Sequence, residues 1–190
     1  MPVGTIIVLA FLAFVAVTIF KGVRIVPQGY KWIVQRLGKY HSTLNPGLNF
    51  VIPYVDEVAY KVTTKDIVLD IPSQEVITRD NAVLLMNAVA YINLTTPEKA
   101  VYGIENYTWA IQNLVQTSLR SIVGEMDLDD ALSSRDHIKA KLKAAISDDI
   151  SDWGITLKTV EIQDIQPSST MQAAMEAQAA AERQRRATVT

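Results

Sequence analysis

The sequence contains no cysteine and only two histidines among its 190 residues. The absence of cysteine excludes disulfide bonds, thiolate metal sites, a cysteine nucleophile and palmitoylation. A net charge of −2 argues against general nucleic-acid binding, because that function needs a clustered basic face to neutralise phosphates. These absences remove several classes of enzyme and binding protein before any motif is considered.

Motifs for catalysis and metal binding are also scarce. A Ser-His-Asp triad needs a histidine base, but His41 lies in a polar connection and His137 on the exposed side of a predicted helix. A Ser-Lys dyad has no supporting sequence context. The acidic run 127–130 lacks the glycine and distal glutamate of a calcium loop, so we interpret it as a helix start. We therefore predict a protein that is not an enzyme, with no metal or cofactor.

One run at the N-terminus, residues 3–20, contains no charged side chain. As a helix it would measure roughly 27 Å at ~1.5 Å per residue, close to the ~30 Å hydrocarbon core of a bilayer. A cleaved signal peptide would carry a basic segment before the apolar run, and a soluble helix would show a polar face. Neither feature is present, so we predict a membrane span, represented by Val3, Ile7, Phe11, Phe14 and Phe20.

The basic residues Lys21 and Arg24 follow the span, whereas no lysine or arginine precedes it. Because basic flanks remain in the cytoplasm, this orientation signal predicts an outside N-terminus and a cytoplasmic domain. In a lumenal domain, the Asn-X-Thr sequons at Asn93 and Asn106 would be open to glycosylation, although chance occurrence is the simpler interpretation.

The segment after the span has the composition of β-strands joined by tight turns. A short strand around Ile25 should be followed by a turn at 27–29 and then by a second strand that ends at Gly38. Thr78 to Asn81 has the composition of a hairpin turn. Further strands are predicted over residues 59–70, 74–78, 81–93 and 155–165.

An apolar cluster follows the turn at Pro46 and Gly47, and Pro53 keeps this stretch from being a central strand. Isolated apolar loops usually pack inward, so one interpretation is core beneath a loop. The other is a loop that dips into the bilayer interface beside the anchor. The candidate membrane-contact residues are Phe50, Val51, Ile52, Tyr54 and Val55.

The apolar period becomes helical after Thr96 and Pro97, which predict one helix that ends at Gly124. Another helix should run from Ser134 to Gly154. Residues 171–187 consist of strong helix formers without a stop signal, as expected for a helix cut from a longer chain. Its candidate oligomerisation residues are Ala174, Ala177, Ala181, Glu182, Arg183 and Arg186.

Several short motifs follow one another along the chain, each occurring once. The set begins with Val-Pro-Gln-Gly at 26–29, Gln-Arg-Leu-Gly-Lys at 35–39, Asn-Pro-Gly-Leu-Asn-Phe at 45–50 and Pro-Tyr-Val-Asp at 53–56. It continues with residues 69–81, 119–120 together with Gly124, 128–135, 153–155 together with 161–162, and 180–187. This ordered set resembles the stomatin/prohibitin (SPFH, band 7) family, and within it the bacterial QmcA/paraslipin branch, which carries one N-terminal span.

The resemblance implies an α+β fold in which a transmembrane anchor (1–23) precedes an SPFH domain (24–167). That domain should hold a mostly antiparallel sheet with packed helices, followed by the start of a long, coiled-coil-like helix (168–190). The implied function is a non-catalytic oligomeric scaffold that forms rings or cages and organises membrane microdomains. An alternative is a regulatory adaptor of a membrane protease or NfeD-type partner. The implied partners are the lipid bilayer and further copies of the chain, and the implied location is the bacterial inner membrane.

Overall fold

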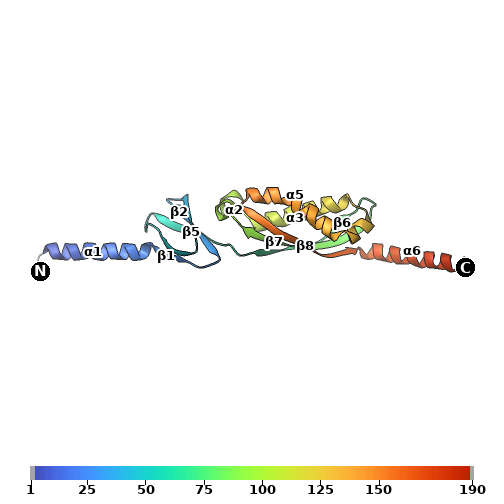
Figure 1. Ribbon diagram of the computed structural model, residues 1–190, viewed down its shortest axis with the longest axis horizontal. Helices are drawn as coiled ribbons and strands as arrows, with labels where there is room; N and C mark the ends of the chain where they lie inside the picture. The colour runs from blue at the N-terminus through green and yellow to red at the C-terminus, as the bar shows by residue number, and fades with distance from the viewer. Residues whose placement is uncertain (1–2, 189–190) are drawn as a thin grey trace. The chain divides into compact units, whose positions relative to one another are not determined.

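The structure is a computed structural model that describes residues 3–188, without the side chains of Glu182 and residues 186–188 (Figure 1). The chain divides into two compact units. The first comprises Met1–Lys65 and Leu94–Gly103, and the second comprises Asp66–Asn93 and Ile104–Thr190. Each unit has its own β-strands and its own helices, and each is described by itself below.

The first unit contains two small antiparallel sheets behind the N-terminal helix. One is the two-stranded ribbon β1-β4, and the other has the strand order β3-β2-β5. A small apolar core is formed by Val26, Val34, Leu44 and Val51, against which Trp32 and Val58 pack. The elements are α1 (Val3–Gly22), β1 (Val23–Val26), β2 (Tyr30–Arg36), β3 (Lys39–Leu44), β4 (Gly47–Phe50), β5 (Asp56–Thr63) and α2 (Pro97–Gly103).

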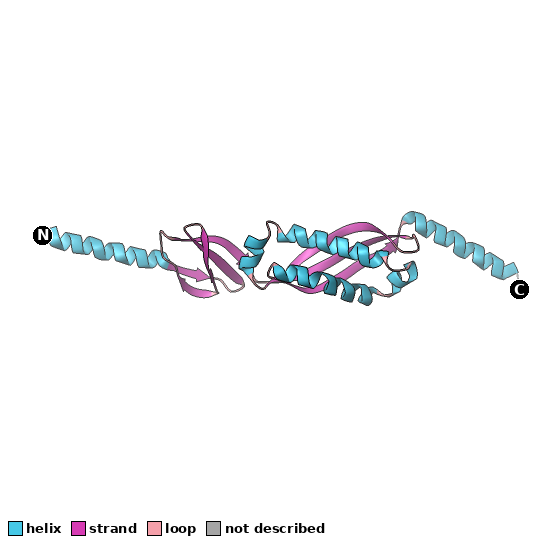
Figure 2. Ribbon diagram, turned by 90° about the horizontal axis from the view of Figure 1, so that it is seen from above, coloured by secondary structure: helices cyan, strands magenta, loops and turns pink. Residues whose placement is uncertain are grey.

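The second unit is a three-stranded sheet, ordered β6-β7-β8, with helices on one face (Figure 2). β6 and β7 pair antiparallel. Hydrogen bonds from Ser168 to Val83 and from Asp164 to Asn87 show that β8 also runs opposite to β7. The elements are β6 (Ile67–Ile77), β7 (Val83–Leu94), α3 (Tyr107–Gly124), α4 (Leu128–Ser133), α5 (Arg135–Asp152), β8 (Ile155–Pro167) and α6 (Ser169–Thr188).

The apolar faces of α3 and α5 are buried in this second unit. α3 packs against β6 and α5, and α5 packs against β8. Because their buried residues recur at helical spacing, each helix presents one continuous apolar stripe to the core. The stripes comprise Ile111, Val115, Leu119, Ile122 and Val123 on α3, and Ile138, Leu142, Ile146 and Ile150 on α5.

The predicted hairpin turn at Thr78 is confirmed, and it also caps a helix. Thr78 Oγ1 accepts a hydrogen bond from the Ala82 amide at 3.0 Å and bonds to the Asp80 carboxylate. Asp80 Oδ2 accepts the Leu128 amide at 3.2 Å, at the first residue of α4. These hydrogen bonds, that of Thr78 foremost, lower the pKa of Asp80. The acidic run 127–130 does begin a helix, but the capping carboxylate comes from the hairpin.

Several predicted boundaries were wrong for identifiable reasons. The single helix from Pro97 to Gly124 is two helices, because Asn106 starts a new one by accepting the Trp109 amide at 3.0 Å. The strand predicted over 59–70 is interrupted between β5 and β6, at residues 64–66. β3 and β4 were not predicted, since their mixed polar composition lacks a strong strand signal.

Candidate membrane-proximal site

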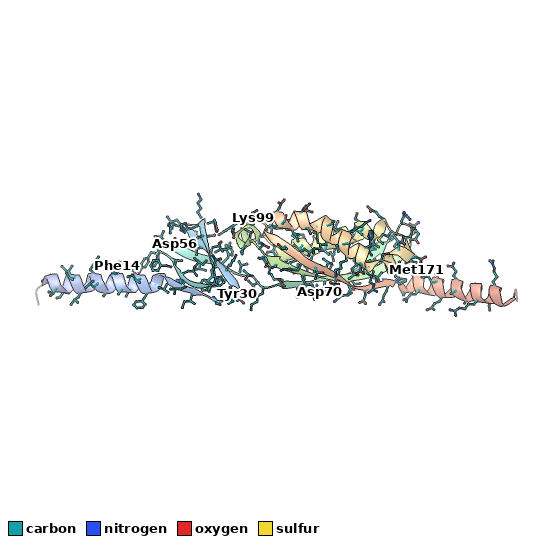
Figure 3. All side chains as sticks on the ribbon, viewed as in Figure 1. Phe14, Tyr30, Asp56, Asp70, Lys99 and Met171 are labelled. Atoms are coloured by element: carbon teal, nitrogen blue, oxygen red, sulfur yellow. The ribbon has the colours of Figure 1, made fainter. Side chains whose placement is uncertain are left out.

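The helix α1 has the length and composition of a membrane span. Gly22 is its only buried residue among those described, and all five predicted span residues (Val3, Ile7, Phe11, Phe14 and Phe20) are exposed. Figure 3 shows the Phe14 side chain projecting from the helix. Thr18 Oγ1 donates to the Phe14 carbonyl at 2.8 Å, so its hydroxyl is satisfied within the helix. A fully apolar surface of this size requires nonaqueous surroundings.

The end of α1 runs into β1 without a loop and packs closely against residues 50 and 51. The Val51 amide donates to the Gly22 carbonyl at 2.8 Å, and β-pairing places Val23 opposite Phe50. A Cβ atom on Gly22 would lie 2.7 Å from the Val51 oxygen and 2.8 Å from the Phe50 ring. Only glycine therefore fits at this junction.

We predict that Gly22→Val opens the junction between α1 and β4. The new side chain must displace the Val51 carbonyl or the Phe50 ring, at a cost of about 1–3 kcal/mol. Amide hydrogen exchange in the detergent-solubilised protein should become about fivefold or more faster at Val51, since 1.4 kcal/mol corresponds to tenfold. Gly4→Val is the matched control, because a Cβ at Gly4 meets no atom within 4 Å. Equal protection of Val51 in both variants would contradict the prediction.

The apolar loop divides between core and surface. Val51 is buried in the core of the first unit, as the inward interpretation requires. The other four candidate residues, Phe50, Ile52, Tyr54 and Val55, are exposed, and Tyr54 is exposed to 70%. The inward interpretation is therefore wrong for these four. The physical reason is backbone geometry: Phe50, the last residue of β4, points outward, the next residue Val51 points inward, and the chain then turns at Tyr54 with φ 73°.

An ion pair between Arg36 and Asp56 holds the end of this loop. Arg36 Nε and Nη2 donate to the two carboxylate oxygens of Asp56 at 2.6 and 3.0 Å, and the Ile52 amide donates to Asp56 at 2.9 Å. The Asp56 side chain is only 3% exposed, whereas that of Arg36 is 36% exposed. The hydrogen bonds from Arg36, followed by that from Ile52, lower the pKa of Asp56 to about 2. The loop is thus fixed with its apolar residues facing outward.

The β1-β4 ribbon adds a second exposed apolar surface, which sequence reasoning missed. Ile25 pairs with Leu48 and Val23 pairs with Phe50, so these four side chains share one face of the ribbon. All four are exposed, Leu48 to 78%. The available signal was the apolar i, i+2 spacing within two short strands. We call these four residues, together with Ile52, Tyr54 and Val55, the apolar apron.

Of the basic residues of the orientation signal, Lys21 contacts the apron. Lys21 Nζ lies 5.7 Å from the centre of the Tyr54 ring, within the range of a cation–π contact. Across residues 3–188, neither Lys21 nor Arg24 forms a salt bridge. The apron, the end of α1 and two cations without a salt bridge therefore lie together in the first unit.

The remaining predicted site residues do not join this group. Ala174, Ala177, Ala181 and Arg183 are exposed on α6, and the side chains of Glu182 and Arg186 lie outside the described residues. His41 and His137 are exposed and belong to different units. Asp127 pairs with Arg79. Within the described part of the chain, no group of three histidine, aspartate or glutamate residues could hold a metal ion.

Comparison with known proteins shows the family of this chain. Residues 24–190 match the family described as SPFH domain / Band 7. The chain belongs to the SPFH (band 7) family. Its structure is the expected α+β fold, with antiparallel sheets, packed helices and a C-terminal helix behind an apolar N-terminal helix. Family membership and this helix together identify the SPFH chain as a membrane protein.

This SPFH protein is similar to proteins of an archaeon, of humans and of a mycobacterium. It is 41% identical over 171 residues to an uncharacterized protein of Methanocaldococcus jannaschii, covering 90% of this chain and 85% of that protein. It is 38% identical over 164 residues to human "Stomatin-like protein 2, mitochondrial", covering 86% of this chain and 46% of that protein. It is 36% identical over 190 residues to an uncharacterized protein of Mycobacterium tuberculosis, covering 98% of this chain but 50% of that protein. The chain thus spans about half the length of the human and mycobacterial relatives.

Proposed function

We propose that this SPFH protein is a non-catalytic oligomeric scaffold that forms large ring or cage assemblies and organises membrane microdomains. The observation that carries the proposal is the exposure of α6. Every residue from Gln172 to Ala181 is exposed. Isolated helices gain little stability in water, because most helical stability in proteins comes from packing of one face. Packing against α6 of neighbouring subunits would supply that stability.

The small residues Ala174, Ala177 and Ala181 lie on one face of α6 and allow a neighbouring helix to approach closely. The charged residues Glu182, Arg183 and Arg186 would then form ion pairs between helices. Because α1 confines the subunits to one plane, many weak lateral contacts of this kind add to a strong association.

The membrane attachment in this proposal has two parts. α1 spans the bilayer, and the apolar apron lies in the interface beside it, where exposed aromatic and aliphatic side chains gain from burial. In this proposal the membrane is the bacterial inner membrane, and the basic residues Lys21 and Arg24 favour a cytoplasmic SPFH domain. His41 and His137 have no assigned part in this function.

Particle size tests the scaffold proposal. The protein extracted from membranes in mild detergent should form particles of many subunits, measured by mass photometry and electron microscopy. Ala177→Glu with Ala181→Glu should reduce these particles to single chains or small oligomers, because repelling charges would face each other in the helix contact. Gln172→Glu with Ala179→Glu adds the same charge on the opposite face of α6 and should leave the size unchanged. A wild-type protein that runs as a monomer would refute the proposal.

A second candidate function is a regulatory adaptor that binds a membrane protease or an NfeD-type protein. The exposed indole of Trp109, at 64%, favours a protein contact on the second unit, because tryptophan is enriched where binding energy concentrates. This function requires a stoichiometric protein partner in mild-detergent pull-downs. Its loss should change proteolysis without changing assembly size.

A further inference from the structure

A pocket of about 480 Å³ lies in the first unit where α1 ends. Its wall includes Phe20, Lys21, Val23, Arg24, Tyr54 and Asp56. Figure 3 labels Asp56 on the strand side of this unit and Phe14 within the apolar helix. We call this space the anchor pocket. It combines apolar and charged groups, as a site for an amphipathic molecule would.

The charge of the anchor pocket is positive. Lys21 and Arg24 form no salt bridge with any residue in the range 3–188. Asp56 is the acidic group in the wall, but its carboxylate is neutralised by two hydrogen bonds from Arg36 and one from the Ile52 amide. Two cations therefore remain without an acidic partner, in a place suited to an anion.

A neighbouring pocket of about 320 Å³ shares Arg24, Val51 and Asp56 with the anchor pocket, and within residues 3–188 Arg24 forms no salt bridge with its acidic lining. That pocket is also lined by Glu57 and Lys61, whose charges offset each other. Lys61 Nζ lies 4.6 Å from the centre of the Trp32 ring.

The length of α1 sets the level at which the anchor pocket is expected relative to the bilayer. Residues 3–20 match the hydrocarbon thickness, so in a membrane crossed by α1 we expect Lys21 and Arg24 at the level of the lipid phosphates. Phe20 at the end of α1 and Val23 at the start of β1 supply apolar lining beside these two cations. A soluble anion would match the cations but not the apolar wall.

We propose that the anchor pocket binds the headgroup phosphate of an anionic phospholipid. The Arg24 guanidinium offers a planar pair of donors to two phosphate oxygens, and the Lys21 ammonium adds a point charge. Phe20 and Val23 contact the first carbons of the acyl chains. The site goes beyond the scaffold function and depends only on the insertion of α1 into the membrane.

Lipid titration of the detergent-solubilised protein tests this site. The probes are short-chain phosphatidylglycerol, short-chain phosphatidylcholine and inorganic phosphate, with bound ligands counted by native mass spectrometry. Lys21→Gln with Arg24→Gln should weaken phosphatidylglycerol binding by about tenfold or more, since two charged contacts are lost. Lys39→Gln with Lys99→Gln removes the same charge from exposed positions of the same unit. This control should change binding by less than about twofold, as expected for surface charges alone.

Three results would overturn the lipid site: equal weakening in both variants, no weakening in either, or inorganic phosphate binding as tightly as phosphatidylglycerol. Phosphatidylcholine should bind more weakly than phosphatidylglycerol, because its choline group offsets the phosphate charge. Titration of purified protein avoids any effect of the substitutions on membrane orientation. Particle size measured on the same samples should not change, so failure of the lipid site is separable from failure of the scaffold proposal.

Discussion

Replacing both Phe11 and Phe14 by aspartate should prevent α1 from inserting into the membrane. Both side chains are exposed on the span, near its middle, and neither has a partner in the protein core. On insertion scales each aspartate near the helix centre costs about 3 kcal/mol, so the pair costs about 6 kcal/mol. The measurement is the fraction of protein left in the membrane pellet after alkaline carbonate extraction, which should fall from nearly all to a small minority.

Two matched variants isolate the effect of charge at depth. Phe11→Leu with Phe14→Leu keeps the span apolar and should leave the protein in the pellet. Phe20→Asp places one charge at the end of the span, where the cost is small because the side chain reaches the interface. If the double aspartate variant stayed in the pellet like the leucine variant, α1 would not be the main anchor and the apolar apron would have to hold the protein.

Asp56→Asn should destabilise the first unit by about 2–3 kcal/mol, because it removes one partner of a largely buried, charge-assisted hydrogen-bond group. The amide keeps the shape of the carboxylate but leaves the Arg36 guanidinium without a counter-charge. The measurement is the free energy of opening from amide hydrogen exchange at β2 and at Ile52 in the detergent-solubilised protein. Asp149→Asn, on the exposed surface of α5, is the control and should change stability by less than about 0.5 kcal/mol.

The same ion pair predicts a pH dependence with a definite sign. The folded-state pKa of Asp56 is lowered to about 2, below its ordinary value of 3.8. Its contribution to stability is therefore complete above about pH 4 and is lost as the pH falls through the folded-state pKa. Between pH 4 and pH 2, the Asp56→Asn variant should therefore lose less stability than the wild type, because it has no carboxylate to protonate at this position. Equal loss in the wild type and the variant over that window would show that Asp56 does not stabilise the fold through its charge.

The sequence predicted those features that depend on composition or on nearby residues. The span follows from a charge-free run, and the turn at Thr78 follows from turn-forming residues between two apolar strands. The capping role of Asp80 could not be predicted, because its partner Leu128 is 48 residues away along the chain. Short-range patterns carry no information about such a contact.

The candidate site shows the same division. Lys21, Arg24 and the apolar loop were identified from the sequence, but the side of the ribbon to which Phe50 points is fixed by pairing with Val23. Ile25 and Leu48 join the apron through the same register. The Arg36–Asp56 pair and the fit of Val51 against Gly22 are likewise long-range contacts. Sequence reasoning therefore identified most residues of the candidate site, whereas the strand register determines which of them lie together.

The close fit at Gly22 makes α1 and the β1-β4 ribbon one mechanical element. No loop separates α1 from β1, and the hydrogen bond between the Val51 amide and the Gly22 carbonyl resists bending at the junction. A helix in a thinner bilayer tilts to bury its apolar length. If α1 spans the bilayer as proposed, we expect the ribbon to rotate with it. Bilayer thickness would then set the angle at which the apolar apron meets the membrane surface.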